Sequence, residues 1–461
     1  MSKLDCVLVY PEPSLESPAK GPALSIFYPG AMLENKGYNV EYIDLRFEKQ
    51  KVLENIIAEC PLAVGISSMT GYQLIGAKKV IEFVKEYDKN IKTILGGPHV
   101  TIQKEKVLKE QKGIDYYIVG EGEIQLCNLM HCIKNNKKFD PKRYENIHVN
   151  LDAIPSPLTE KTKPYYKIAN NANSIRVLTT RGCMYSCNFC YNQAVYNGKW
   201  KKMGIHIFEK EIENLNKEFD IKHIILGDDN IGNNKQRIKN IGDIMKRYDI
   251  KWHSSIRPEW VKHDMINILE KGGCDSLFLG IESGSERILT EVINKKLPRG
   301  LLDIRDCTKN LAKSTISGMY SFMCAIPTET NEELLESMNL ADWIFKTDPN
   351  ARLGFYVYAP YPGTKMYEMA LATGFNEPRN WDEWSKVSLS ESWGEEWENF
   401  YYMTGLHFRK DKTEQNFPGI RRDIIKLYED LANLHWRNRT WKDFPGKNVK
   451  HLIIKERHRL N

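Results

Sequence analysis

The chain has 461 residues, of which 41% are hydrophobic, and this length favours two or three domains. Its 66 Lys and Arg residues nearly balance its 60 Asp and Glu residues, and a net charge of only +6 argues against a nucleic-acid partner. No apolar run reaches the length of a membrane-spanning helix and the N-terminus lacks a signal-peptide pattern, so we expect a cytoplasmic protein without a transmembrane segment.

Up to residue 134, short strand patterns alternate with helical ones. Strands are predicted at 6–10, 38–43, 63–67, 93–95 and 115–119, and helices at 25–36, 51–60, 72–87 and 104–111. Such β/α alternation is typical of a parallel sheet with helices on both faces. The sequence therefore predicts an α/β fold that begins with a doubly wound parallel sheet, in a domain of residues 1–140.

The loops that follow these strands are rich in glycine. Residues 67–71, 96–99 and 120–123 stand where the carboxyl ends of parallel strands bind ligands. Any one of them is explained by a tight strand-to-helix turn, but together on one sheet edge they indicate a ligand, because glycine lets the backbone approach it closely.

Residues 141–174 are polar and contain several prolines, which predicts a linker. A second β/α series then places strands at 175–179, 223–226, 251–255, 276–279, 316–324 and 352–358, with helices between them. Six such strands predict a partial (β/α)6 barrel over residues 175–375. Residues 376–461 are expected to form a small, mainly helical region. The aromatic residues from Trp381 to Tyr402 are interpreted as core, with the lining of a substrate pocket as the alternative, and the basic tail is interpreted as solvated surface.

Three cysteines follow the first strand of the second series within eight residues: Cys183, Cys187 and Cys190. Thiolates are the ligands that iron–sulfur clusters need, and three of them leave one iron of a four-iron cluster open to a small molecule. A structural zinc site is the alternative, but it would need a fourth ligand, and no Cys or His follows closely. The other seven cysteines are scattered, as buried thiols in a reducing compartment would be.

This cysteine spacing, with the aromatic Phe189 before the last cysteine, resembles the radical S-adenosylmethionine (SAM) superfamily over residues 175–375. The resemblance implies that the three cysteines hold a 4Fe–4S cluster whose open iron binds SAM, which is cleaved to methionine and a 5′-deoxyadenosyl radical. It also implies a set of SAM contacts near strand ends: Phe189, Asp228, Ser255, Arg257, Glu282 and Ser283. The segment 226–230 departs from the family's usual Gly-Gly-Glu form.

Structural roles compete with these SAM contacts. Asp229 and Asn230 would also suit a helix cap, Arg257 an ion pair with Glu259, and residues 283–285 a cap without an anion.

The first domain is similar to the cobalamin-binding domain that precedes many radical SAM modules. The resemblance implies that the glycine-rich loops contact the corrin and its nucleotide tail through Ser67, Met69, Gly96, Gly97, Gly120, Glu121 and Glu123. The Asp-x-His-x-x-Gly motif that supplies a cobalt-ligating histidine elsewhere is absent. We therefore expect cobalt without a histidine, with Met69 nearest its lower face, and interpret His99 as a tail contact or a surface residue.

The paired domains favour a cobalamin-dependent methyltransferase that acts on an unactivated centre of a small molecule, natural-product or lipid precursor. An electron donor such as flavodoxin or ferredoxin is the expected protein partner. One alternative is a radical dehydration, rearrangement or ring-forming reaction in which cobalamin is absent or structural. A second is an iron–sulfur protein that only carries electrons or senses redox state. The sequence assigns no catalytic residue beyond the cofactor ligands.

Overall fold

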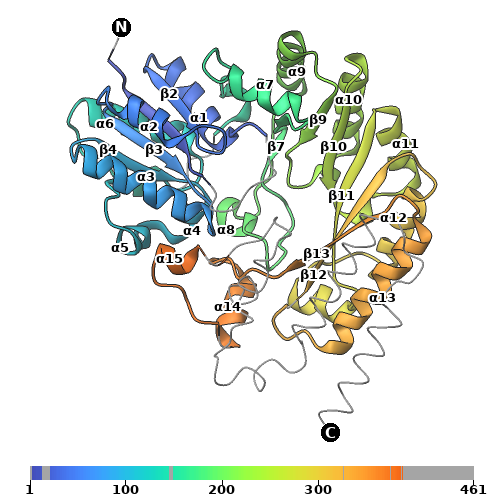
Figure 1. Ribbon diagram of the computed structural model, residues 1–461. Helices are drawn as coiled ribbons and strands as arrows, with labels where there is room; N and C mark the ends of the chain where they lie inside the picture. The colour runs from blue at the N-terminus through green and yellow to red at the C-terminus, as the bar shows by residue number, and fades with distance from the viewer. Residues whose placement is uncertain are drawn as a thin grey trace.

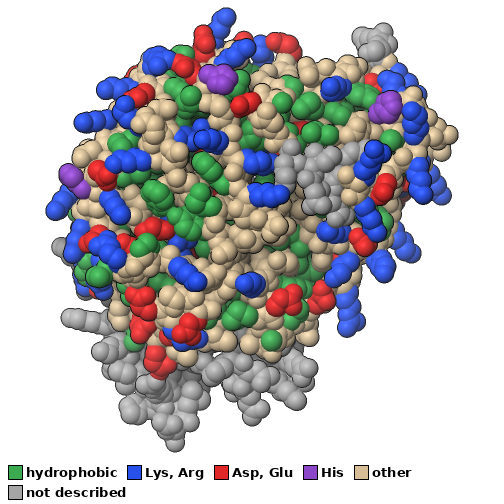
Figure 2. Space-filling model, turned by 180° about the vertical axis from the view of Figure 1, so that it is seen from behind, with side chains coloured by type: hydrophobic (Ala, Val, Ile, Leu, Met, Phe, Trp, Pro, Cys, Tyr) green, Lys and Arg blue, Asp and Glu red, His purple; other side chains and the backbone are tan. Residues whose placement is uncertain are grey.

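The computed structural model describes residues 3–12, 21–144, 149–324, 326–373, 375–385 and 387. Figure 1 shows two α/β units beside each other, the first in blue and the second running from green to orange. Within this part of the chain, no helix is long and apolar enough to cross a membrane. On the face shown in Figure 2, basic and acidic side chains are interspersed.

The first unit is a five-stranded parallel sheet in the order β2-β1-β3-β4-β5. Its strands are β1 (Cys6–Tyr10), β2 (Val40–Asp44), β3 (Ala63–Ser67), β4 (Lys92–Gly96) and β5 (Tyr116–Tyr117). Its helices are α1 (Leu24–Asn35), α2 (Gln50–Ile57), α3 (Gln73–Tyr87), α4 (Pro98–Gln103), α5 (Val107–Glu110) and α6 (Gly122–Lys134). Apolar residues of α1 and α6 share one core and those of α2 and α3 another, which confirms the doubly wound fold. Helices α4 and α6 were not predicted, because the glycine-rich loops that precede them hid their starts.

The second unit is a six-stranded parallel sheet in the order β13-β12-β11-β10-β9-β6. Its strands are β6 (Arg176–Val177), β9 (His223–Leu226), β10 (Lys251–Ile256), β11 (Cys274–Glu282), β12 (Ser317–Cys324) and β13 (Arg352–Val357). Helices α9 (Ile205–Phe219), α10 (Lys235–Arg247), α11 (His263–Lys271), α12 (Leu301–Leu311) and α13 (Asn331–Thr347) lie between them. Six parallel strands in chain order confirm the partial barrel and bring all their carboxyl ends to one edge.

The segment predicted as a linker contains a packed helix, α7 (Lys163–Asn171). Tyr165 and Tyr166 are buried, and the Tyr165 hydroxyl donates to the carbonyl oxygen of Tyr42 at 2.9 Å. Pro164 stands in the first turn of α7, where the missing N–H costs nothing. A proline that suggested a loop therefore marks the start of a helix that packs on the first unit.

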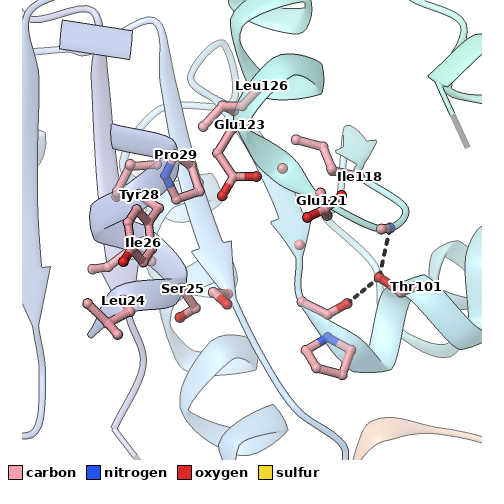
Figure 3. A pocket seen from close by; sticks show the side chains of 18 of the residues that line it. Leu24, Ser25, Ile26, Tyr28, Pro29, Thr101, Ile118, Glu121, Glu123 and Leu126 are labelled. Carbon is pink, nitrogen blue, oxygen red and sulfur yellow. Dashed lines mark hydrogen bonds between the residues drawn. The ribbon is translucent and has the colours of Figure 1, made fainter. Parts of the chain in front are cut away.

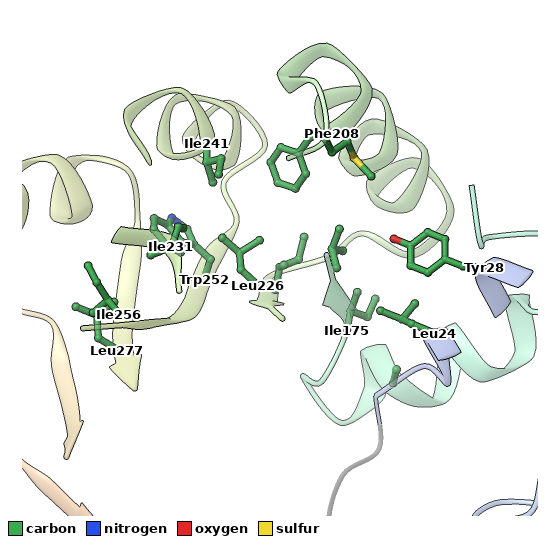
Figure 4. Packing of buried hydrophobic residues seen from close by; sticks show 14 of the residues in the cluster. Leu24, Tyr28, Ile175, Phe208, Leu226, Ile231, Ile241, Trp252, Ile256 and Leu277 are labelled. Atoms are coloured by element: carbon green, nitrogen blue, oxygen red, sulfur yellow. The ribbon is translucent and has the colours of Figure 1, made fainter. Parts of the chain in front are cut away.

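The two units share one hydrophobic core. Figure 4 shows Leu24 and Tyr28 of α1 facing Ile175 and Phe208 of the second unit. A continuous core of this kind fixes the position of one sheet relative to the other.

Glu211 is buried near this junction, one turn beyond Phe208 on α9, and burial raises the pKa of its carboxyl group to about 8. Between about pH 4.5 and 8 the folded chain holds a proton that the unfolded chain has released, so stability should fall as the pH rises. The decline is about 1.4 kcal/mol per pH unit. We expect Glu211→Gln to remove this decline. The free energy of unfolding of the variant, measured with urea, should therefore rise relative to that of the wild type by about 2–3 kcal/mol between pH 5.5 and pH 7.5. The exposed Glu213→Gln on the same helix is the control; a Glu211→Gln difference that does not change with pH would contradict the prediction.

The chain then returns to the first unit. After α14 (Lys365–Ala372), the short helix α15 (Trp381–Trp384) lies against the first unit (Figure 1), where Lys78 forms an ion pair with Asp382 at 2.8 Å. Trp381 and Trp384 are fully buried, which confirms the core interpretation for these two. Trp393, Trp397, Tyr401, Tyr402 and the basic tail lie outside the described residues.

Candidate functional site

The three clustered cysteines lie on one loop at the carboxyl edge of the second sheet. The loop runs between β7 (Thr180–Arg181) and β8 (Lys201–Lys202), which pair antiparallel, and it contains α8 (Asn192–Tyr196). Cys183, Cys187 and Cys190 are all half-buried. Burial raises the pKa of Cys190 to about 12, and the neighbouring Cys187 and Cys183 add to this shift. Three half-buried cysteines that stand within eight residues on one loop suit ligation of a 4Fe–4S cluster.

Hydrogen bonds to distant elements hold this cluster loop in place. The Asn188 amide N–H donates to the Ile293 carbonyl at 2.7 Å, and its side-chain amide donates to the Val292 carbonyl at 2.8 Å. Gly182 has a φ of +80° and lies so close to the Lys199 carbonyl that a Cβ would be 2.1 Å from it. Only glycine fits there, which fixes the turn that leads into Cys183.

Arg257 extends from the end of β10 to the cluster loop. Its guanidinium lies 3.9 Å from the centre of the Tyr185 ring, and its Nη1 atom is 3.5 Å from the Cys187 sulfur. Its Nε donates to Glu259 at 2.5 Å, so the ion pair considered as an alternative role is present. The pair leaves Arg257 in contact with the cysteine loop all the same.

The two neighbouring aspartates after β9 do different things. Asp228 is buried and accepts from the backbone N–H groups of Thr179 and Thr180 at 2.7 and 2.9 Å, and from the Thr179 hydroxyl at 2.5 Å. Its carboxylate therefore holds the chain at the end of the first strand. Asp229 instead interacts with Asn192 and the Gly182 backbone within the cluster loop, and burial raises its pKa. Sequence reasoning selected Asp228, but the carboxylate that lies at the loop is Asp229.

The predicted SAM contacts on β11 lie in buried networks. Glu282 has a φ of +72° and pairs with Lys295 at 3.1 Å. The Ser283 hydroxyl is 3.1 Å from that of Ser337 and accepts from the Ser285 N–H at the same distance.

The other two predicted SAM contacts are less enclosed. Ser255 is half-buried on β10, and Phe189 is half-buried against a small apolar cluster next to the cysteine loop. The structure thus brings Phe189 and Arg257 to the cysteines and gives Asp228 and Ser283 protein partners.

A cavity of about 280 Å³ lies at the carboxyl edge of the first sheet (Figure 3). Six of the predicted cobalamin contacts line it: Ser67, Gly96, Gly97, Gly120, Glu121 and Glu123. A Cβ added to Gly120 would meet no atom within 4 Å, so this glycine borders open space. The opposite wall comes from α1 and from Arg181 and Tyr196 of the cluster loop region, which sequence reasoning did not assign to this site. Backbone-lined loops around an open, largely apolar cavity fit a corrin tail.

The structure places His99 and Met69 in different surroundings. His99 is fully buried, with Nδ1 2.9 Å from the Thr70 hydroxyl and Nε2 3.1 Å from Glu110. Its ring also packs edge-on against Trp381 and Trp384, so the interpretation as a tail contact or a surface residue is wrong. Met69 is 41% exposed on the loop after β3 and does not line the cavity.

A buried ion-pair network connects the loop after β5, which lines this cavity, to the two strands that flank the cluster loop. Arg181, two residues before Cys183, pairs with Glu121 at 3.0 Å and with Glu123 at 2.6 Å. Lys201 of β8 also pairs with Glu121, and although burial opposes ionisation, these two cations lower the pKa of Glu121. The predicted cobalamin contacts Glu121 and Glu123 therefore tie the first unit to the strand that begins the cluster loop.

Removing the cation from this network should destabilise the chain strongly. Arg181→Met leaves Glu123 buried without a counter-charge, which costs about 3–5 kcal/mol. Urea unfolding should show this loss, against less than about 1 kcal/mol for Lys346→Met, which removes an exposed ion pair with Asp342. Equal losses in the two variants would refute the buried network.

Comparisons with known proteins match both halves of the chain. Residues 15–130 match the B12 binding domain and residues 177–341 the radical SAM superfamily. The chain is 28% identical to an uncharacterised methyltransferase of Pyrococcus horikoshii over 80% of this chain and 82% of the relative. It is 26% identical to the bacteriochlorophyllide d C-8(2)-methyltransferase of Chlorobaculum tepidum over 71% and 72%. The fold is similar to that of TsrM, a radical SAM methyltransferase of Kitasatospora setae that was solved with cobalamin and a 4Fe–4S cluster bound. The two chains are 17% identical and superpose with a TM-score of 0.67, over 81% of this chain and 76% of TsrM.

Proposed function

We propose that this chain, a radical SAM enzyme with a B12-binding domain ahead of its radical SAM domain, transfers a methyl group by way of cobalamin to an unactivated carbon or phosphorus centre. The substrate we propose is a small molecule, a natural-product precursor or a lipid precursor. The observation that carries this proposal is the shared wall of the cavity: Arg181 and Tyr196, which border the cysteine loop, line the same cavity as Gly97 and Gly120. A methyl carrier held there lies beside the cluster loop.

The residues of the cluster loop have defined roles in this proposal. Cys183, Cys187 and Cys190 hold the 4Fe–4S cluster, which supplies the electron that cleaves SAM. Arg257 positions the loop by stacking on Tyr185 and contacting Cys187. We assign SAM contacts to six residues and add Asp229 to them: Phe189, Asp228, Ser255, Arg257, Glu282 and Ser283. The Asp228 carboxylate also holds Thr179, directly before the strand that leads into the loop.

In the first unit, the glycines of the loops after β4 and β5 leave room for cobalamin, which would supply the transferable methyl group. Gly97 and Gly120 keep the backbone clear of side chains, and α1 closes the apolar wall with Leu24 and Tyr28. Both ring nitrogens of the buried His99 already have protein partners, Thr70 and Glu110, so this histidine would not serve as a cobalt ligand. We propose that Met69, exposed at the sheet edge, faces the lower side of the corrin.

The reaction needs an electron and a substrate besides the cofactors. We propose a low-potential donor such as flavodoxin or ferredoxin as the protein partner, and the cytoplasm as the location, because thiol ligands and a reducible cluster require a reducing compartment.

Anaerobic reconstitution with iron, sulfide and hydroxocobalamin tests the function. Gel-filtered protein is analysed for iron, for corrin and for its ultraviolet–visible spectrum, and is then incubated with SAM and dithionite. The proposal expects a corrin beside a four-iron cluster, with 5′-deoxyadenosine formed from SAM. A cluster without corrin would refute methyl transfer and favour a dehydration, rearrangement or ring-forming reaction, whereas a cluster that leaves SAM intact would favour a redox protein.

A further inference from the structure

We propose that a groove on the outer side of the cluster loop is the docking surface for an acidic one-electron carrier protein. This proposal rests on the proposed function, in which the cluster consumes electrons. The groove has a volume of about 500 Å³ and is bordered by Tyr185 of the cluster loop, by Trp260 and by the residues that precede α12. It lies apart from the cavity of the first sheet, with which it shares no lining residue.

A short series of contacts joins this groove to a cluster ligand. The Trp260 indole N–H donates to the Tyr185 hydroxyl at 2.8 Å. The Tyr185 ring stacks on Arg257, whose Nη1 atom is 3.5 Å from the Cys187 sulfur. The wall between the groove and Cys187 is therefore no thicker than these packed side chains, and a carrier seated in the groove is close to the cluster loop.

The charge of the groove fits a negatively charged partner. Each of its acids is already paired with a basic side chain, in the pairs Glu259–Arg257, Asp264–Lys235 and Asp303–Arg299. Lys262 and Lys296 are exposed on the rim, and neither forms an ion pair with the part of the chain that the structure describes. Two uncompensated cations attract an acidic protein and raise its rate of association.

The shape of the site favours a protein over a small molecule. Met184, which precedes Tyr185 in the cluster loop, is 51% exposed and offers an apolar side chain to a partner that covers this loop. Complexes between redox proteins are small and weak, so a shallow groove with a few charges is sufficient. The groove has no lining residue in common with the proposed SAM contacts Ser255, Glu282 and Ser283, so the proposed docking surface is a separate set of residues.

In the electron transfer itself, one electron leaves the carrier, for instance when a flavin hydroquinone becomes a semiquinone, and the cluster is reduced by one electron. No bond is formed or broken in this step. The residues of the groove hold the carrier and contribute no proton.

The test reverses the two rim charges in the double variant Lys262→Glu/Lys296→Glu of the reconstituted full chain. Flavodoxin serves as the probe: its binding is measured by titration calorimetry at low salt, and reduction of the cluster by its hydroquinone form is followed by stopped-flow absorbance. We expect binding and reduction both to weaken at least tenfold and to lose most of their salt dependence. Reduction by dithionite, which needs no docking surface, should be unchanged.

The matched control is Lys109→Glu/Lys112→Glu, an equal change of charge on exposed residues of the first unit. It should behave as the wild type. Unchanged flavodoxin binding in the rim variant, or an equal effect of the control variant, would overturn the docking proposal. If dithionite fails to reduce the cluster even in the wild type, the proposed function fails instead.

Discussion

Replacing Cys187 with alanine is expected to abolish SAM cleavage and to remove most of the iron from the reconstituted protein. The thiol lies between the other two cysteines in sequence and contacts Arg257 at 3.5 Å, and a four-iron cluster held by only two thiolates is not retained. Iron and sulfide analysis, together with the yield of 5′-deoxyadenosine after reduction with dithionite, measures the effect. Cleavage should fall to the level of protein that was never reconstituted.

A second cysteine variant separates loss of a ligand from loss of any thiol. Cys60 is exposed and far along the chain from the cluster loop, so Cys60→Ser should keep the iron content and cleavage rate of the wild type. Cleavage that survives in Cys187→Ala would refute the cluster assignment, and equal iron loss in both variants would show a general effect on reconstitution.

Replacing Gly97 with valine is expected to reduce the corrin content at least tenfold while the iron–sulfur cluster still assembles. Gly97 has a φ of +102°, which side chains rarely adopt, and an added Cβ would lie 2.4 Å from the Ser68 carbonyl oxygen. The clash involves backbone and forces apart the loops after β3 and β4 that border the cavity. Corrin and iron are quantified after gel filtration of the reconstituted variant.

The adjacent glycine provides the matched control. A Cβ on Gly96 would meet only the Ile66 carbonyl, at 3.9 Å, so Gly96→Ala is tolerated by the backbone and should retain far more corrin than Gly97→Val. Corrin uptake by Gly97→Val equal to that of the wild type would refute the use of this loop. A variant that lost both cofactors would indicate misfolding, which circular dichroism distinguishes.

The sequence predicted the parts of the fold whose signals are local. The strands at His223–Leu226 and Ala63–Ser67 have the predicted bounds, because their patterns of apolar residues end at clear turn residues. Helix α7 was missed because its polar outer face and Pro164 outweighed two buried tyrosines. Its packing depends on Tyr42, more than 120 residues earlier.

The same distinction applies to the candidate site. The spacing of the three cysteines and the glycine-rich loops could be read directly. The pairing of Arg181 with Glu121 and Glu123 joins residues about 60 positions apart, and no local pattern reports it. The one local signal for this pairing was that Arg181 stands directly before Gly182, at the start of the cluster loop. The different partners of Asp228 and Asp229 could not be predicted for a similar reason, because only the fold decides which carboxylate receives the backbone N–H groups of Thr179 and Thr180.

The return of the chain to its first sheet has a consequence for protein synthesis. The histidine at position 99 and the glutamate at 110 receive their partners Trp381 and Trp384 from a segment translated 271 or more residues later. At about 5–20 residues per second, the ribosome needs roughly 15–60 s to deliver that segment. During this interval the nascent first unit presents an uncovered apolar surface around His99. A chaperone that binds such surfaces would therefore act on this protein between the completion of its first domain and the emergence of Trp381 and Trp384.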